Sequence, residues 1–171
     1  MFIKTKKSFS DLLLNKEAKE QLKDTEKLLV NKKIKSKTGF GSLFIGPSDG
    51  DKKTAAALLG QSFDKQVYHV DLSKVVSKYI GETEKNLDKL FSRAEDKGWI
   101  LFFDEAEALF GKRTGVKDSN DRYANIEINY LLQKMEAHPE LVILSANSKK
   151  NIDKAFMRRL RTIVHFDPPP G

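Results

Sequence analysis

The chain runs through five apolar residues into two acids at residues 99–105, which read WILFFDE. A strand that is apolar throughout, without the alternation of a half-exposed strand, is typical of a parallel sheet covered by helices on both faces. Leu141–Leu144 is a second run of this kind. Because such sheets bind ligands at the carboxyl ends of their strands, Asp104 and Glu105 stand where a functional site is expected.

Strand and helix patterns alternate on both sides of this stretch. Besides 99–103 and 141–144, strands are expected at 42–45, 67–70 and 162–166, and helices at 15–30, 54–59, 87–94 and 125–136. Asn15 is of a capping type for the first helix. The order predicts an α/β fold with a mostly parallel five-stranded sheet flanked by helices.

Length and composition bound the protein class. The 171 residues, 39% of them hydrophobic, suffice for one domain with a sizeable core. The absence of cysteine excludes disulfides and thiolate metal sites, and no stretch is long and apolar enough for a signal peptide or a membrane span. These features favour a soluble, cytoplasmic protein without a membrane partner.

The positive charge is concentrated at one end. Residues 1–39 hold eleven lysines and five acids, which accounts for +6 of the net charge of +7. No aromatic residues interleave with these lysines, so a solvated helix face is favoured over a nucleic-acid partner. His69, His138 and His165 share no metal-ligand spacing, and no zinc site is predicted.

Three polar features could carry chemistry. Asp104 could hold Mg²⁺ while Glu105 polarises an attacking water; the alternative is a pair of exposed acids after a buried strand. Asn147 follows the next apolar strand and could position that water, or be a turn residue. Arg158 and Arg161, three apart at a helix end and on one face of it, could reach a neighbouring phosphate, or form a solvated basic turn.

These motifs, in this order, resemble a known family. The spacing of Gly46-Pro47, Phe102–Glu105, Asn147 and the two arginines resembles the large ATPase subdomain of AAA+ proteins of the AAA clade, over nearly the whole chain. The resemblance implies a three-layer P-loop NTPase-like fold that uses ATP and Mg²⁺. A helical lid follows this subdomain in the family, and the sequence lacks it.

The resemblance also implies roles. Asp104 would organise Mg²⁺ as the Walker B acid, Glu105 would be the catalytic base and Asn147 would sense the γ-phosphate. Arg158 and Arg161 would be arginine fingers acting on the next subunit of a homo- or hetero-hexameric ring.

Two further segments match family features. Residues 79–85 resemble the aromatic-hydrophobic-glycine pore loop, with Tyr79, Ile80 and Gly81 facing a channel that grips a polypeptide substrate; a surface turn is the alternative. Asp11, Leu12 and Leu13 precede the first helix where the family contacts adenine, although plain apolar packing explains them equally well.

The phosphate-binding loop departs from the family pattern G-x-x-x-x-G-K-[ST]. Its residues are Gly46, Pro47, Ser48, Asp49, Gly50, Asp51, Lys52, Lys53 and Thr54. Aligned without a gap, Lys52 matches the lysine, but Asp51 replaces the second glycine and Lys53 replaces the hydroxyl that binds Mg²⁺. The Asp51 carboxylate would repel a phosphate charge about 4 Å away by about 4 kcal/mol at an effective dielectric near 20. The Lys53 ammonium cannot coordinate a metal ion.

Two alternatives would rescue nucleotide binding. A loop one residue longer would make Lys53 and Thr54 the lysine and hydroxyl pair. Otherwise the Lys53 ammonium could occupy the place of the metal, so that nucleotide binds without Mg²⁺ and is hydrolysed poorly.

The expected organisation is a basic helical segment at 1–39 that packs on the core, an ATPase subdomain at 40–167, and the start of a linker at 168–171. The leading hypothesis is an ATP-binding and ATP-hydrolysing module of a protein-remodelling or threading machine, monomeric as this chain alone. The alternative is a degenerate subunit that binds nucleotide weakly or not at all and serves as a scaffold in a ring. A P-loop kinase or nucleic-acid motor is disfavoured because residues 40–171 are nearly neutral.

Overall fold

The computed structural model describes residues 1–35, 40–110, 119–150 and 152–167. The strands are β1 (Phe2–Ile3), β2 (Gly41–Ile45), β3 (Val67–Asp71), β4 (Ile100–Asp104), β5 (Val142–Ala146) and β6 (Thr162–His165). The helices are α1 (Lys16–Lys35), α2 (Asp49–Ser62), α3 (Leu72–Val75), α4 (Glu82–Lys97), α5 (Glu107–Phe110), α6 (Ser119–Ala137) and α7 (Lys154–Met157), with a 3-10 turn at Phe9–Asp11. The expected linker at 168–171 lies outside the described residues.

The strands form one sheet in the order β1-β3-β4-β5-β2-β6. The pairs β3–β4, β4–β5, β5–β2 and β2–β6 are parallel, which confirms the predicted α/β fold. The sixth strand, β1, pairs antiparallel with β3 and was not predicted. Two residues are too few to show a strand pattern, and what orders them is tertiary packing of the Phe2 ring edge-on against Tyr68 and Trp99.

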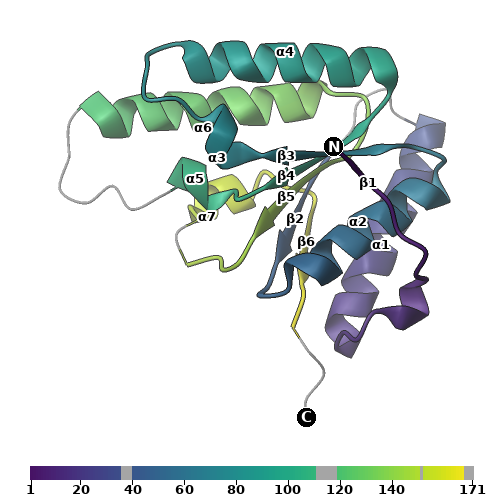
Figure 1. The fold of residues 1–171 in the computed structure, drawn as a ribbon. Helices are drawn as coiled ribbons and strands as arrows, with labels where there is room; N and C mark the ends of the chain where they lie inside the picture. Colours follow the sequence, from purple (N-terminus) through teal and green to yellow (C-terminus); the bar gives the residue numbers. More distant parts are fainter. Residues whose placement is uncertain (36–39, 111–118, 151, 168–171) are drawn as a thin grey trace.

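Helices cover both faces of the sheet (Figure 1): α4 and α6 lie on one face and α1 and α2 on the other. Leu101 and Phe103 of β4 belong to the core under α4 and α6. Ile100 and Phe102 belong to the core on the opposite face. This two-sided burial explains why the strand is apolar at every position.

The first helix begins where the sequence predicted. The side chain of Asn15 accepts a hydrogen bond from the Ala18 amide at 2.8 Å, as a capping residue does. The Asn15 amide itself donates to the Asp167 carbonyl at 3.3 Å, so the start of α1 is tied to the residues after β6. Within the described ranges, no helix is long and apolar enough to span a bilayer.

Candidate functional site

Three neighbouring parallel strands, β4, β5 and β2, end at the same edge of the sheet and carry predicted site residues there. Asp71 is in register with Asp104, and Ile45 is in register with Ala146. The chain therefore places Gly46, Asp104 and Asn147 at neighbouring strand ends, as the sequence predicted.

Gly46 makes the first turn out of β2. Its φ is 154°, and a Cβ at this position would lie 2.7 Å from the Phe166 carbonyl oxygen. Only glycine fits this close approach of two backbones without a shift. The Gly46 amide donates to the Ala146 carbonyl at 3.1 Å, which joins the loop to the end of β5.

The rest of the expected phosphate loop is helical, which corrects the prediction that the helix starts near Thr54. Helix α2 begins at Asp49, so only Gly46, Pro47 and Ser48 remain as loop. Ser48 is the N-cap, and its hydroxyl accepts from the Asp51 amide at 3.2 Å. Serine is a good N-cap and acids in a first helical turn are favourable, so Asp49 and Asp51 promote a helix where glycines would leave an open loop.

Lys52 is buried beneath this turn. Its side chain is 0% exposed. The ammonium donates to the carbonyls of Gly46 at 2.7 Å and Ala146 at 3.0 Å, and to Asn147 Oδ1 at 3.4 Å. It also lies 3.3 Å from Asp49 Oδ1. The lysine that would reach a phosphate instead holds the loop to the strand ends.

Lys53 and His69 both face Asp104. Lys53 Nζ lies 3.8 Å from Asp104 Oδ2, and His69 Nε2 lies 3.2 Å from the same oxygen. A cation thus stands beside the carboxylate that was predicted to organise Mg²⁺. His69 was not predicted to lie at the site. The sequence feature that could have indicated it is its position on β3, the strand before β4, two residues short of the strand end.

Glu105 has a strained backbone. Its φ is 59°, in the left-handed region that few residues other than glycine adopt. The Glu105 amide donates to Asp104 Oδ1 at 2.9 Å, while the Glu105 side chain is exposed. Desolvation raises the pKa of this carboxyl, and the negative charges of Asp104 and Glu107 raise the pKa further. A carboxyl with a raised pKa is suited to accept a proton from water.

Asn147 is held from two sides. Its side-chain Oδ1 accepts a hydrogen bond from Lys52, and its backbone amide donates to Glu107 Oε2 at 3.3 Å. Glu107 Oε1 is buried and has no hydrogen-bond partner among the described residues. Glu107 was not predicted as a site residue, because an acid in the first turn of a short helix is common and needs no functional explanation.

The segment before α4 presents two exposed apolar side chains. Tyr79 is 61% exposed and Ile80 is 77% exposed. The Ser77 hydroxyl accepts from the Tyr79 amide at 3.1 Å and donates to Glu82 Oε2 at 2.9 Å. Gly81 follows with a φ of 82° as the N-cap of α4, so a defined turn projects the pair outward.

Residues 42–168 match the sequence model of the ATPase family associated with various cellular activities, abbreviated AAA. The chain belongs to the AAA family. It is 29% identical to cell division protein C of Sulfolobus acidocaldarius over 97% of this chain and 47% of that protein. It is 29% identical to the probable 26S proteasome regulatory subunit 10B of Caenorhabditis elegans over 88% of this chain and 40% of that protein.

A third relative of the AAA chain is the vesicular-fusion protein sec18 of Schizosaccharomyces pombe, 32% identical over 74% of this chain and 18% of that protein. The chain therefore spans less than half the length of these relatives. The match confirms the predicted family, whose members are ATPases.

Mg²⁺-ATP does not fit this AAA site as it is arranged. The Asp51 and Lys52 amides, which a phosphate loop would turn toward phosphate, donate to Ser48 instead. Lys53 stands beside Asp104 where a metal would bind.

The two arginines of the AAA chain do not share one helix face, contrary to the prediction. Helix α7 ends at Met157, Arg158 is its C-cap, and the Arg161 amide donates to the Gly41 carbonyl at 2.9 Å at the entry to β6. The helix ends because the chain must turn into the edge strand of the sheet. Both side chains are exposed, and Arg158 lines a separate pocket of about 350 Å³ with Lys149, Lys154 and His165.

The residues proposed to contact adenine differ in exposure. Asp11 Oδ2 accepts from the Ser8 amide at 2.8 Å and so closes the local 3-10 turn. Leu12 is 3% exposed and Leu13 is 75% exposed. Packing accounts for Leu12, and Leu13 remains available for contact.

Proposed function

We propose that this chain is an AAA subunit whose own nucleotide site is closed and which serves as a structural partner in a ring. The observation that carries the proposal is the 3.8 Å approach of Lys53 Nζ to Asp104 Oδ2. An ammonium at this point opposes Mg²⁺ by like charge and takes up the carboxylate that would hold the metal. Buried Lys52 adds to this, because its release would take a charged donor away from the carbonyls of Gly46 and Ala146.

In this proposal the exposed arginines and the exposed apolar pair act on other molecules. Arg158 and Arg161 are exposed and free to reach the nucleotide of an adjacent subunit, whose phosphate loop supplies turnover. Tyr79 and Ile80 project as apolar side chains that hold a polypeptide without reading its sequence. The hexameric ring, the polypeptide substrate and the cytoplasmic location remain parts of the proposal.

A second candidate is ATP hydrolysis by the chain itself. It is favoured by Glu105, whose raised pKa and strained backbone are typical of a residue kept for chemistry. Hydrolysis would require the first turn of α2 to unwind and Lys52 to leave its carbonyl partners. The two candidates differ in whether nucleotide binding depends on Mg²⁺.

Titration with a fluorescent ATP analogue, with and without Mg²⁺, separates the candidates. The experiment compares the wild-type chain with Asp51→Gly/Lys53→Thr, and uses Asp96→Gly/Lys97→Thr near the end of α4 as a matched control. We expect weak, Mg²⁺-independent binding by the wild type and control, and Mg²⁺-dependent binding by the restored variant. Equally tight, Mg²⁺-dependent binding by all three would refute the closed site and favour hydrolysis.

A further inference from the structure

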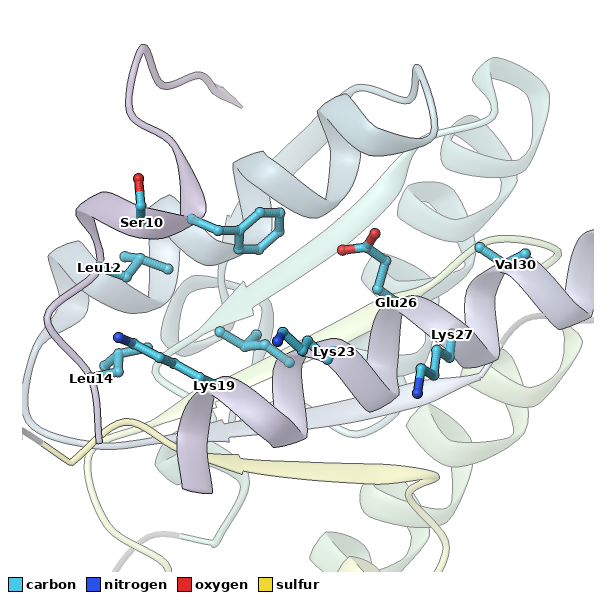
Figure 2. Close-up of a pocket in the computed structure, with 10 residues that line it drawn as sticks. Ser10, Leu12, Leu14, Lys19, Lys23, Glu26, Lys27 and Val30 are labelled. Atoms are coloured by element: carbon cyan, nitrogen blue, oxygen red, sulfur yellow. The ribbon is translucent and has the colours of Figure 1, made fainter. Parts of the chain in front are cut away.

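A cavity lies away from the strand-end site, on the face of the domain covered by α1. It has a volume of about 660 Å³ and opens between the 3-10 turn and α1 (Figure 2). Apolar side chains from both elements line it: Phe9, Leu12, Leu14, Leu22 and Val30. Val30 is 48% exposed, so part of this apolar surface faces solvent.

Charged side chains accompany the apolar lining along its length. Lys19, Lys23 and Lys27 line the cavity from α1 and are all exposed. They recur every fourth residue, so successive Cα atoms are about 6 Å apart along the helix axis. In the portion of the chain that the structure describes, none of the three is in an ion pair. Glu26 is the single acid of the lining.

This distribution selects among possible ligands. An amphiphile with one anionic head group would need its cations gathered at one end of the cavity, whereas these lysines are spread over more than two helical turns. A second amphipathic helix meets the requirement, because its acids can recur once per turn beside an apolar stripe. The excess of lysine over acid in residues 1–39 supports an acidic partner.

We infer that this cavity, lined by the residues named above, binds a partner protein through an amphipathic helix, and that this helix carries acids along one flank. The apolar stripe of the partner lies on half-buried Phe9 and exposed Val30, above a floor made by the buried Leu12 and Leu22, and its acids face the three lysines. Glu26 faces one basic residue of the partner and so fixes the register. The inference does not depend on whether the nucleotide site is closed.

Fluorescence anisotropy with synthetic peptides tests this surface on the complete 171-residue chain. The probe is a labelled 14-residue helix with leucines at i, i+3, i+4 and i+7 and a glutamate every fourth residue on one flank. Its twin carries lysine in place of each glutamate. We expect the glutamate peptide to bind, the binding to weaken with salt, and the lysine peptide not to bind.

The variant Lys23→Glu/Lys27→Glu is compared with Lys85→Glu/Lys89→Glu, which makes the same changes at the same spacing on exposed positions of α4. We expect the α1 variant to bind the glutamate peptide about tenfold more weakly and to gain binding of the lysine peptide. The α4 variant should match wild type. Circular dichroism confirms that both variants remain folded.

Four outcomes would overturn the inference. The first is no binding of either peptide, and the second is equal binding of both. The third is an equal loss in both variants, which would indicate general charge attraction. In the fourth, neither peptide binds, but the wild-type chain binds decanoate or self-associates in sedimentation, and the α1 variant loses that property. Binding of decanoate would identify the occupant as an amphiphile, and self-association would identify it as a second copy of the chain.

Discussion

Lys53 Nζ lies 3.8 Å from Asp104 Oδ2, so a cation of the chain faces the carboxylate at the end of β4. The preceding residue, Lys52, is buried beneath the loop and bonded to two carbonyls. Two adjacent lysines of one helix therefore act differently: Lys52 is part of the packed structure, and Lys53 acts through charge at the surface of the site.

Replacement of Lys52 by methionine is expected to lower the free energy of unfolding by about 2–4 kcal/mol, because the carbonyls of Gly46 and Ala146 lose a buried charged donor. Urea denaturation measures the change. The Lys53 side chain is 40% exposed, so Lys53→Met should lower the free energy of unfolding by less than about 1 kcal/mol. Equal losses in the two variants would contradict the structural role of Lys52.

Glu105→Gln is expected to stabilise the protein at neutral pH. The folded protein raises the pKa of Glu105 above 4.5, so the ionised side chain costs free energy in the folded state. The gain in the free energy of unfolding should be full at pH values above the pKa of Glu105 in the folded protein. It should disappear as the pH falls to about 4.5 and below, where wild-type Glu105 is neutral. Thermal unfolding of both proteins across this range tests the sign; a gain that is independent of pH would exclude the charge as its cause.

Glu105→Gly is expected to stabilise the protein by about 1 kcal/mol more than Glu105→Ala. Both variants remove the charge, but only glycine adopts a φ of 59° without strain. Chemical denaturation of the pair at one pH isolates the backbone contribution. If alanine is as stable as glycine here, the residue is not strained.

The contact between α4 and α6 gives a pH-dependent prediction. Tyr130 donates a short hydrogen bond to Asp88, and Lys134 Nζ lies 2.7 Å from Asp88 Oδ1. Lys134 and Tyr130 lower the pKa of Asp88 below 3.8, so its stabilising contribution is present above that pH and is lost as pH falls through the folded pKa.

Asp88→Asn should therefore cost less than about 1 kcal/mol at neutral pH, since the side chain is 47% exposed, and nothing in strong acid. Unfolding followed at both pH values measures the difference. Asp96→Asn, which replaces another exposed acid of the same helix, serves as the control.

Tyr79→Ala/Ile80→Ala is expected to leave the free energy of unfolding within about 0.5 kcal/mol of wild type, because both side chains are largely exposed. Thr83→Val should cost more, since Thr83 is fully buried and its hydroxyl accepts from the Ser77 amide at 2.9 Å. A large loss in the double variant would show that the pair packs in the domain and does not serve as a contact surface.

The sequence could predict the features that depend on local pattern. The unbroken apolar run of β4 required a strand covered on both faces, and the parallel order then placed Asp104 and Asn147 at one edge. The capping of α1 by Asn15 was readable for the same reason, since a cap depends on residues within one turn. Strand β1 and the separation of Arg158 from Arg161 were not readable, because each is set by packing between distant segments.

The loop after β2 shows the division most clearly. The sequence by itself determined that Asp51 and Lys53 stand where a glycine and a hydroxyl are expected, and that the site must therefore be altered. Only the tertiary structure decided what the residues of the altered loop do: Lys52 turns into the protein toward the carbonyls of Gly46, just after β2, and Ala146 of β5, and Lys53 and His69 converge on Asp104. These partners lie on strands distant in sequence, and their approach depends on sheet register and burial, which no local pattern encodes.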